Sequence, residues 1–76
     1  MEIKLITFGK ITSITGRDVL VKDVADTDSL RTVLEANFPA LKDTEFLIAV
    51  NREIIGENKT LGPGSEVALL PPFSGG

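Results

Sequence analysis

The residues with the clearest chemical potential stand at the end of the sequence. They form one short segment made of Pro71, Pro72, Phe73, Ser74, Gly75 and Gly76. Because glycine has no Cβ, Gly75 and Gly76 can enter a slot too narrow for any other residue. The group that reaches the bottom of such a slot is the terminal carboxylate. We therefore expect the carboxylate of Gly76 to be the working group, with Gly75 giving it access.

The two prolines separate this segment from the apolar run at residues 67–70. A proline lacks the backbone N–H and fixes φ, so it ends strand pairing. Pro72 also pushes Pro71 toward extended geometry. We expect residues 71–76 to leave the domain as an extended arm. The competing interpretation is a tail without function, since chain ends are often disordered. The preceding strand, the proline pair and the single aromatic residue favour a functional tail.

Composition restricts the function classes. The 76 residues contain no cysteine and no histidine, so a thiolate nucleophile, a disulfide and the commonest metal ligand are all absent. The formal net charge is −3, opposite to the basic surface of a nucleic-acid binder. The sequence opens without a signal-peptide pattern, and its apolar runs are too short to span a bilayer. We expect a cytoplasmic domain with protein partners, no bound metal or cofactor, no nucleic acid and no membrane contact.

Carboxylates are the remaining candidates for catalysis within the chain. Asp23, Asp26 and Asp28 follow one another closely and could form an acid–base pair. Their position between a strand and a helix explains them more simply as helix caps and solvated charges. We expect the chain not to be an enzyme on its own.

The pattern of apolar residues predicts five strands and one main helix. Loose alternation or short apolar runs indicate strands at residues 3–8, 19–24, 46–50, 54–55 and 66–70. Cap candidates at residues 26–29 and apolar residues at helical spacing predict a helix that Pro39 ends. Residues 9–18 are rich in Gly, Thr, Ser and Asp and predict a turn-rich connection. Residues 42–45 are expected to form a solvated loop.

This order predicts an α+β fold with the helix on one face of the sheet. The first two strands should form an antiparallel hairpin, and the first and last strands should lie side by side in the centre. Both 3–8 and 46–50 carry apolar residues on both sides, so we expect both of their faces to be buried. The expected fold is a ubiquitin-like β-grasp: a mixed sheet of four to five strands, within a single domain of residues 1–76.

Three stretches then resemble the small subunit of molybdopterin synthase, a β-grasp sulfur-carrier family. They are residues 4–9, residues 49–51 and, most specifically, residues 61–76 with their Pro-Pro-x-x-Gly-Gly ending. The resemblance implies that a ubiquitin-activating-type enzyme uses ATP to adenylate Gly76, which then becomes a thiocarboxylate. It also implies that the tail enters the large synthase subunit and delivers sulfur to cyclic pyranopterin monophosphate. The assembly implied is a heterotetramer in which the large subunit holds the active site.

The same resemblance implies a partner-binding surface. Phe8, Ile54 and Leu70 match family positions that contact the large subunit, and Phe73 matches a position along the insertion channel. Pro71, Pro72 and Ser74 belong to the inserted tail. This role requires Phe8, Ile54 and Leu70 to form one exposed patch near the root of the tail, as interaction surfaces often do.

Three alternatives share much of this pattern. A sulfur carrier for thiamine or cysteine synthesis also ends in Gly-Gly on a β-grasp fold, although the Pro-Pro pair favours the molybdopterin carrier. A ubiquitin-like protein modifier would use the same activation of its terminal carboxylate. A plain interaction domain would make no use of its terminus.

Overall fold

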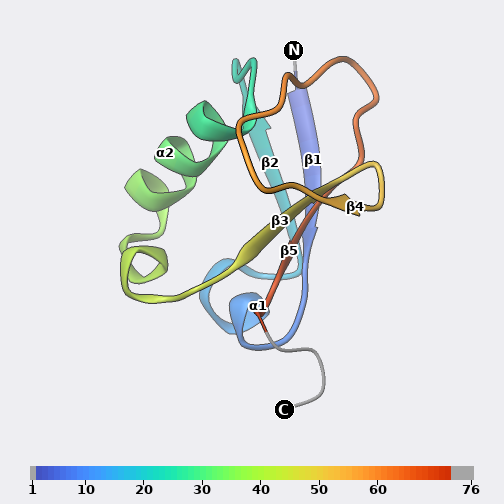
Figure 1. The fold of residues 1–76 in the computed structure, drawn as a ribbon. Helices are drawn as coiled ribbons and strands as arrows, with labels where there is room; N and C mark the ends of the chain where they lie inside the picture. The colour runs from blue at the N-terminus through green and yellow to red at the C-terminus, as the bar shows by residue number, and fades with distance from the viewer. Residues whose placement is uncertain (1, 73–76) are drawn as a thin grey trace.

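The computed structural model describes residues 2–72 (Figure 1). The strands are β1 (Glu2–Thr7), β2 (Asp18–Lys22), β3 (Leu47–Val50), β4 (Glu53–Ile54) and β5 (Val67–Leu70). The helices are α1 (Lys10–Thr15) and α2 (Thr27–Asn37), with a 3-10 helix, η1, at Pro39–Asp43. No helix in this part of the chain is long and apolar enough to cross a membrane.

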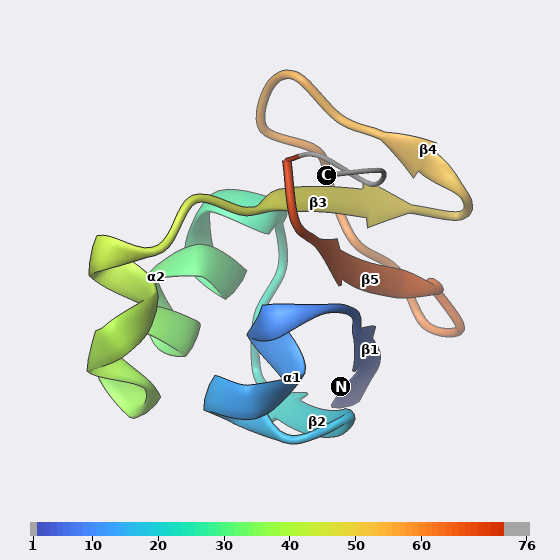
Figure 2. The same ribbon diagram turned by 90° about the horizontal axis from the view of Figure 1, so that it is seen from below.

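The strands form one mixed sheet in the order β2-β1-β5-β3-β4. The pairing of β1 with β5 is parallel, and the pairings β1–β2, β5–β3 and β3–β4 are antiparallel. Figure 2 shows this order from β2 at one margin to β4 at the other. The expected hairpin of the first two strands and the interior position of the first and last strands are confirmed. The last strand therefore lies in the middle of the sheet, and the tail leaves from there.

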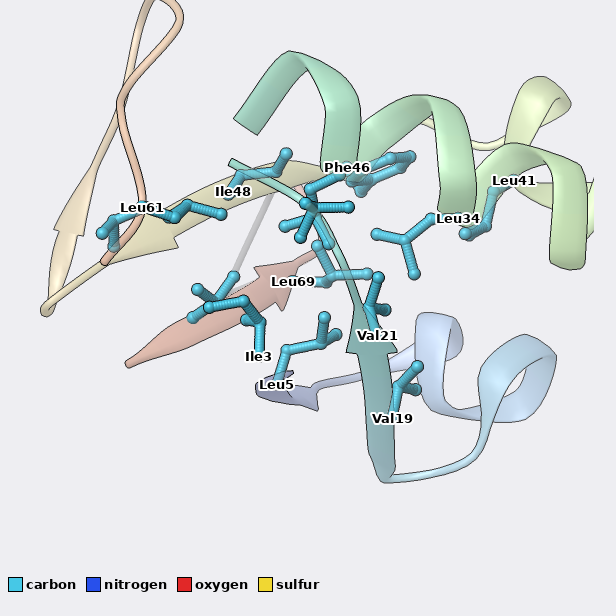
Figure 3. Close-up of a cluster of buried hydrophobic side chains, with 14 of the residues drawn as sticks. Ile3, Leu5, Val19, Val21, Leu34, Leu41, Phe46, Ile48, Leu61 and Leu69 are labelled. Atoms are coloured by element: carbon cyan, nitrogen blue, oxygen red, sulfur yellow. The ribbon is translucent and has the colours of Figure 1, made fainter. Parts of the chain in front are cut away.

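One hydrophobic core fills the space between the sheet and α2 (Figure 3). Burial alternates along β1, where Ile3 and Leu5 face the core. Leu30 and Leu34 of α2 are fully buried against them, and Val33 and Phe38 pack on the same cluster. The predicted helix face is confirmed. Helical spacing from α2 and period-two spacing from the strands meet here, which holds the helix against one face of the sheet.

The expectation that two strands are buried on both faces is wrong. The second face of β1 is open: Ile6 and the following Phe8 are 42% and 47% exposed. In β3 the second face is only partly covered, with Leu47 half-buried and Ala49 buried. A chain with one main helix can cover only one face of its sheet. Apolar residues on both sides of a strand therefore reflect an open apolar face here, and not a second layer.

The prediction of a turn-rich connection at residues 9–18 is also wrong, because it contains helix α1. Its β-branched residues have low helix propensity, so the local sequence gives a weak helical signal. Tertiary burial overrides that propensity: Ile11 is fully buried, and Ile14 packs on the same core. The buried Thr7 hydroxyl donates a hydrogen bond to the carbonyl oxygen of Gly16 at 2.7 Å and lies 3.0 Å from the Thr12 hydroxyl. These contacts fasten α1 between β1 and β2.

Two smaller expectations concern the segment after α2. Pro39 ends that helix as predicted, since α2 stops at Asn37. Residues 42–45 are only in part a loop, because η1 continues to Asp43. Leu41 within η1 is 1% exposed, so the connection is anchored in the core.

The long connection between β4 and β5 is tied to the start of α2. Asp26 is the N-cap, and its carboxylate accepts a hydrogen bond from the Ser29 N–H at 2.9 Å. Asn58 in the connection donates its amide to the other oxygen of Asp26 at 3.3 Å and accepts from the Asp28 N–H at 2.9 Å. The backbone of Lys59 pairs with Thr27 in both directions. Side-chain caps of this kind fix an otherwise irregular segment against the helix.

Acid should loosen this connection through Asp26. Hydrogen bonding by the Ser29 side chain, then by the Ser29 N–H, then by Asn58, lowers the pKa of Asp26 below its ordinary value of 3.8. A carboxyl group with a lower pKa in the folded state adds stability above its unfolded-state pKa. That stability is lost as the pH falls through the folded-state value. In urea melts from about pH 6 to about pH 2, we expect Asp26→Asn to lose less unfolding free energy than the wild type.

Asp28→Asn is the matched control, because it removes an exposed carboxylate from the same helix turn. It should keep the acid dependence of the wild type. An Asp26→Asn variant that loses stability in acid as steeply as the wild type would contradict the prediction.

Candidate functional site

The candidate site lies on the face of the sheet that α2 leaves open. Strand alternation directs one set of side chains to this face, and several of them are large and apolar. The most exposed are Ile6 at 42%, Phe8 at 47%, Leu20 at 56% and Ile54 at 60%. Isolated exposed apolar residues are normal, but a group of them on one face marks an interaction surface.

A hollow of about 370 Å³ lies on this face where the tail begins. Its lining consists of Phe8, Gly9, Leu47, Ile54, Leu70, Pro71 and Pro72. The register explains the grouping, since Leu47 pairs with Leu70, and Ile54 pairs with Ala49 in the same strand β3. Phe8 follows β1 and adds the other side. We call these seven residues the root patch.

The structure thus brings together the three residues predicted to form one exposed patch. Phe8 and Ile54 are exposed, while Leu70, Pro71 and Pro72 are half-buried. Phe73, Ser74, Gly75 and Gly76 lie outside the described residues. Their roles, and the partner-binding role of the root patch, stay predictions.

A second, larger hollow of about 600 Å³ continues along the same face toward the start of β1. Ile6, Ala49 and Ala68 contribute apolar lining, and Phe8 lines both hollows. At the rim, the Arg52 guanidinium lies 3.6 Å from the Glu66 carboxylate, with both side chains largely exposed. Exposed ion pairs of this kind contribute little stability. The open face therefore offers a continuous apolar surface with a charged border.

The direction of the tail root is set by the turn that follows β1. The Phe8 N–H donates to the Leu69 carbonyl oxygen at 3.0 Å, which extends the parallel pairing by one bond. Gly9 then passes so close to Pro71 that a Cβ on Gly9 would lie 3.0 Å from the Pro71 Cγ. Gly9 also has φ +60°, a backbone conformation that favours glycine. The pyrrolidine ring of Pro71 thus rests directly on the backbone of the turn.

A smaller hollow of about 360 Å³ flanks the tail root from the helix side. Pro72 and Leu47 line it together with charged residues of α2 and the segment that follows. The Arg31 guanidinium carbon lies 4.8 Å from the centre of the Phe46 ring, a cation–π geometry. The tail root therefore leaves the domain between an apolar surface on one side and a polar one on the other.

Ionisable groups are not gathered at the tail root. Within residues 2–72, no group of three or more His, Cys, Asp or Glu side chains is placed to hold a metal ion. The described carboxyl group with a shifted pKa, Asp26, caps the start of α2, whereas the tail root lies near the end of that helix in Figure 1. What the described residues offer at the tail root is apolar contact area and a fixed exit direction.

Comparison with known proteins identifies the family. The model described as the ThiS family matches residues 5–76. The chain belongs to the ThiS family. The molybdopterin synthase sulfur carrier subunit of Caenorhabditis briggsae is 32% identical over 83 residues, which cover 100% of this chain and 99% of the relative. The resemblance drawn from residues 4–9, 49–51 and 61–76 is therefore confirmed.

Two solved structures share the fold over the whole chain. One is a complex of subunits 1 and 2 of molybdopterin-converting factor from Helicobacter pylori, with 29% identity, full coverage of both chains and a TM-score of 0.75. The other is SAMP1, the small archaeal modifier protein 1, from Haloferax volcanii, with 26% identity, full coverage of both chains and a TM-score of 0.74. The predicted ubiquitin-like β-grasp fold is confirmed.

The sequence interpretation missed three residues of this region. Ile6 and Leu47 were assigned to doubly buried strands, yet each lines a hollow on the open face. Their signal was their spacing, because Ile6 stands two residues before Phe8 and on the same side of its strand. Gly9 was treated as a turn residue, and nothing local in the sequence reveals its contact with Pro71. That contact joins residues far apart in the chain.

Substitution of Gly9 should displace the tail root. In Gly9→Ala, the positive φ costs about 1–3 kcal/mol of unfolding free energy. The new Cβ also meets the rigid Pro71 ring, which adds about 1 kcal/mol of overpacking. Chemical denaturation should report the loss, and NMR shifts of Leu70 and Pro71 should report the displacement.

Gly16→Ala provides the matched control. Gly16 has φ +84°, but a Cβ there would meet nothing within 4 Å. It should show the backbone cost without shift changes at Pro71. Equal stability losses and unshifted Pro71 signals in both variants would mean that the Gly9 contact does not hold the tail root.

Proposed function

We propose that this chain is a sulfur carrier of molybdenum cofactor biosynthesis, acting as the small subunit of a molybdopterin synthase. The observation that carries the proposal is the full-length similarity to proteins of that name, which includes the final Gly-Gly of this chain. The root patch adds support, because a carrier needs a docking surface beside the tail that delivers its cargo. The match to a complex of two molybdopterin-converting factor subunits supports a large-subunit partner.

The proposed chemistry takes place on the carboxylate of Gly76. A carboxylate oxygen attacks the α-phosphate of ATP in an adenylating enzyme, and pyrophosphate leaves. A sulfur nucleophile at the oxidation level of sulfide then attacks the acyl carbon, and the bond to AMP breaks. The product is a thiocarboxylate whose sulfur replaces one oxygen of Gly76. A chain without cysteine can carry sulfur in this way, and the ATP belongs to the partner enzyme.

In this proposal the chain is a co-substrate and not the catalyst. The thiocarboxylate is presented to cyclic pyranopterin monophosphate inside the large subunit, which supplies the catalytic groups. Phe8, Ile54 and Leu70 would dock against that subunit, and Pro71 and Pro72 would direct the tail into it. Phe73 and Ser74 would line the insertion channel, and the small glycines would let the carboxylate reach its end.

A ubiquitin-like modifier is the second candidate, favoured by the structural match to SAMP1. In that case the activated carboxylate would form an amide with a lysine of another protein. A sulfur carrier for thiamine or cysteine synthesis would undergo the same activation but serve a different acceptor. The three functions therefore separate at the acceptor and not at the adenylation step.

The intact mass of the chain tests the carrier function. After co-expression with its adenylating enzyme, we expect a species heavier by one oxygen-to-sulfur exchange, localised to Gly76. Adding the large subunit and cyclic pyranopterin monophosphate should return the mass to that of the carboxylate. A mass that never changes with active enzyme and ATP would contradict the carrier function, and covalent adducts on lysines would favour the modifier.

Gly76→Ala and Gly75→Val are the matched variants for this experiment. Both should fold as the wild type does, because they lie beyond the last strand. Both should fail to become adenylated, since their added carbons occupy the space that glycine leaves free. Normal sulfur transfer by either variant would contradict the proposed use of the tail.

The root patch is tested separately by a charge at Ile54. Because Ile54 is 60% exposed, Ile54→Glu should leave folding intact. It should weaken binding to the large subunit by on the order of tenfold or more, since a buried apolar contact becomes a buried charge. Isothermal titration of the purified subunits would measure this.

Leu20→Glu is the control, because Leu20 is similarly exposed and lies on the same face at the opposite margin of the sheet. It should bind the large subunit with wild-type affinity. Equal losses in both variants would place the docking surface elsewhere.

A further inference from the structure

The sheet has one long unpaired margin. Its order leaves β2 and β4 at the edges, and β4 consists of two residues whereas β2 has five. Figure 2 shows β2 at the margin of the sheet, beyond β1. An edge strand presents a row of backbone donors and acceptors to which another strand can pair. The side chains along β2 then decide which strand fits it.

The register of β1 and β2 fixes which backbone groups face outward. The Thr7 N–H donates to the Arg17 carbonyl oxygen at 3.0 Å, and the same ladder pairs Leu5 with Val19. In an antiparallel ladder, hydrogen-bonded pairs alternate with pairs whose backbone groups point away from each other. The N–H and C=O groups that point away from the sheet therefore belong to Asp18, Leu20 and Lys22. Their side chains are exposed as well.

The sequence of this edge is self-complementary when reversed. Residues 17–23 read Arg-Asp-Val-Leu-Val-Lys-Asp. In an antiparallel pairing centred on Leu20, each Asp18 stands opposite Lys22 of the second copy, and each Leu20 stands opposite itself. One residue beyond the strand on either side, Arg17 stands opposite Asp23. Opposite charges across a ladder attract, and like charges in that position repel.

We propose that two copies of this chain pair through β2, antiparallel and centred on Leu20. The outward N–H and C=O groups of Asp18, Leu20 and Lys22 hydrogen-bond to those of the second copy, joining the two sheets into one. The contact is isologous, as expected of a two-fold dimer. On the open face, the exposed Leu20 side chains meet, flanked by the two Asp18–Lys22 pairs.

Other registers lose this match. A shift by two residues places Leu20 opposite Lys22 or opposite Asp18, so an apolar side chain faces a charge. Within its own chain Lys22 already lies 3.7 Å from Glu2, an exposed pair that leaves the ammonium accessible to a second carboxylate. Charged edge strands usually discourage pairing between sheets. In this register the charges meet with opposite signs and select the partner.

The dimer should be weak and should leave the tail free. One pair of five-residue strands is a small contact compared with a standard stable interface. We expect self-association at protein concentrations of on the order of 0.1–1 mM. β1 separates β2 from β5, the strand that ends at the tail. Self-association through β2 therefore does not depend on the proposed function, and either can fail without the other.

Complementary charge variants of the full chain test the proposal. Sedimentation equilibrium of the wild type should show a mass rising with concentration from 8.1 kDa toward twice that value. Asp18→Lys alone places Lys opposite Lys, and Lys22→Asp alone places Asp opposite Asp, so each should weaken the dimer by on the order of tenfold or more. An equimolar mixture of the two variants restores both opposite-charge pairs and should form a heterodimer.

The mixture also excludes trivial explanations. Both variants stay net negative, because each substitution changes the formal charge of −3 by two units. Circular dichroism should show wild-type folding for each, and NMR of one labelled variant should show shifts at residues 18–22 only on mixing. A wild type that stays monomeric to about 1 mM, single variants that still dimerise, or a mixture that stays monomeric would each overturn the proposal.

Discussion

The central position of β5 is the constraint on which the rest of the structure depends. This last strand pairs in parallel with β1 and antiparallel with β3, so both halves of the sheet are joined through it. Because β1 and β5 run in the same direction, the turn that follows β1 and the segment that follows β5 lie at the same end of the sheet. The hydrogen bond from Phe8 to Leu69 and the contact of Gly9 with Pro71 both follow from this arrangement. The tail root is positioned by the most interior strand of the molecule.

A second consequence comes from the size of the chain. With 76 residues, the main helix is α2, and it covers one face of a five-stranded sheet. A small domain buries only part of the surface that its unfolded chain exposes. The uncovered face remains apolar at Ile6, Phe8 and Ile54, so the chain retains surface that a partner can cover. The same limit that restricts the core thus provides the candidate docking surface.

The sequence predicted the parts of the fold that depend on local pattern. The period of the apolar residues indicated the helix face of α2 and the strands, and the cap at Asp26 and the stop at Pro39 indicated the ends of that helix. Helix α1 escaped prediction because its β-branched residues disfavour a helix, and only the burial of Ile11 in the assembled core makes it form. The open face escaped prediction because an apolar strand looks the same whether a second layer or solvent lies beside it.

The candidate site shows the same division between local and long-range information. The Gly-Gly ending and the Pro-Pro pair are readable in the sequence. Phe8, Ile54 and Leu70 were linked by a resemblance to known carriers, and in the folded chain they line one hollow. The contact between Gly9 and Pro71 joins two turns about 60 residues apart and leaves no local signature.

Under the proposed function this separation has a physical reason. The reacting group sits on a tail that needs no side chain of the domain for its chemistry. The domain has to supply recognition and direction instead, which are properties of assembled surfaces. Substitutions in the root patch and substitutions at Gly76 should therefore affect different steps, the first partner binding and the second activation of the carboxylate.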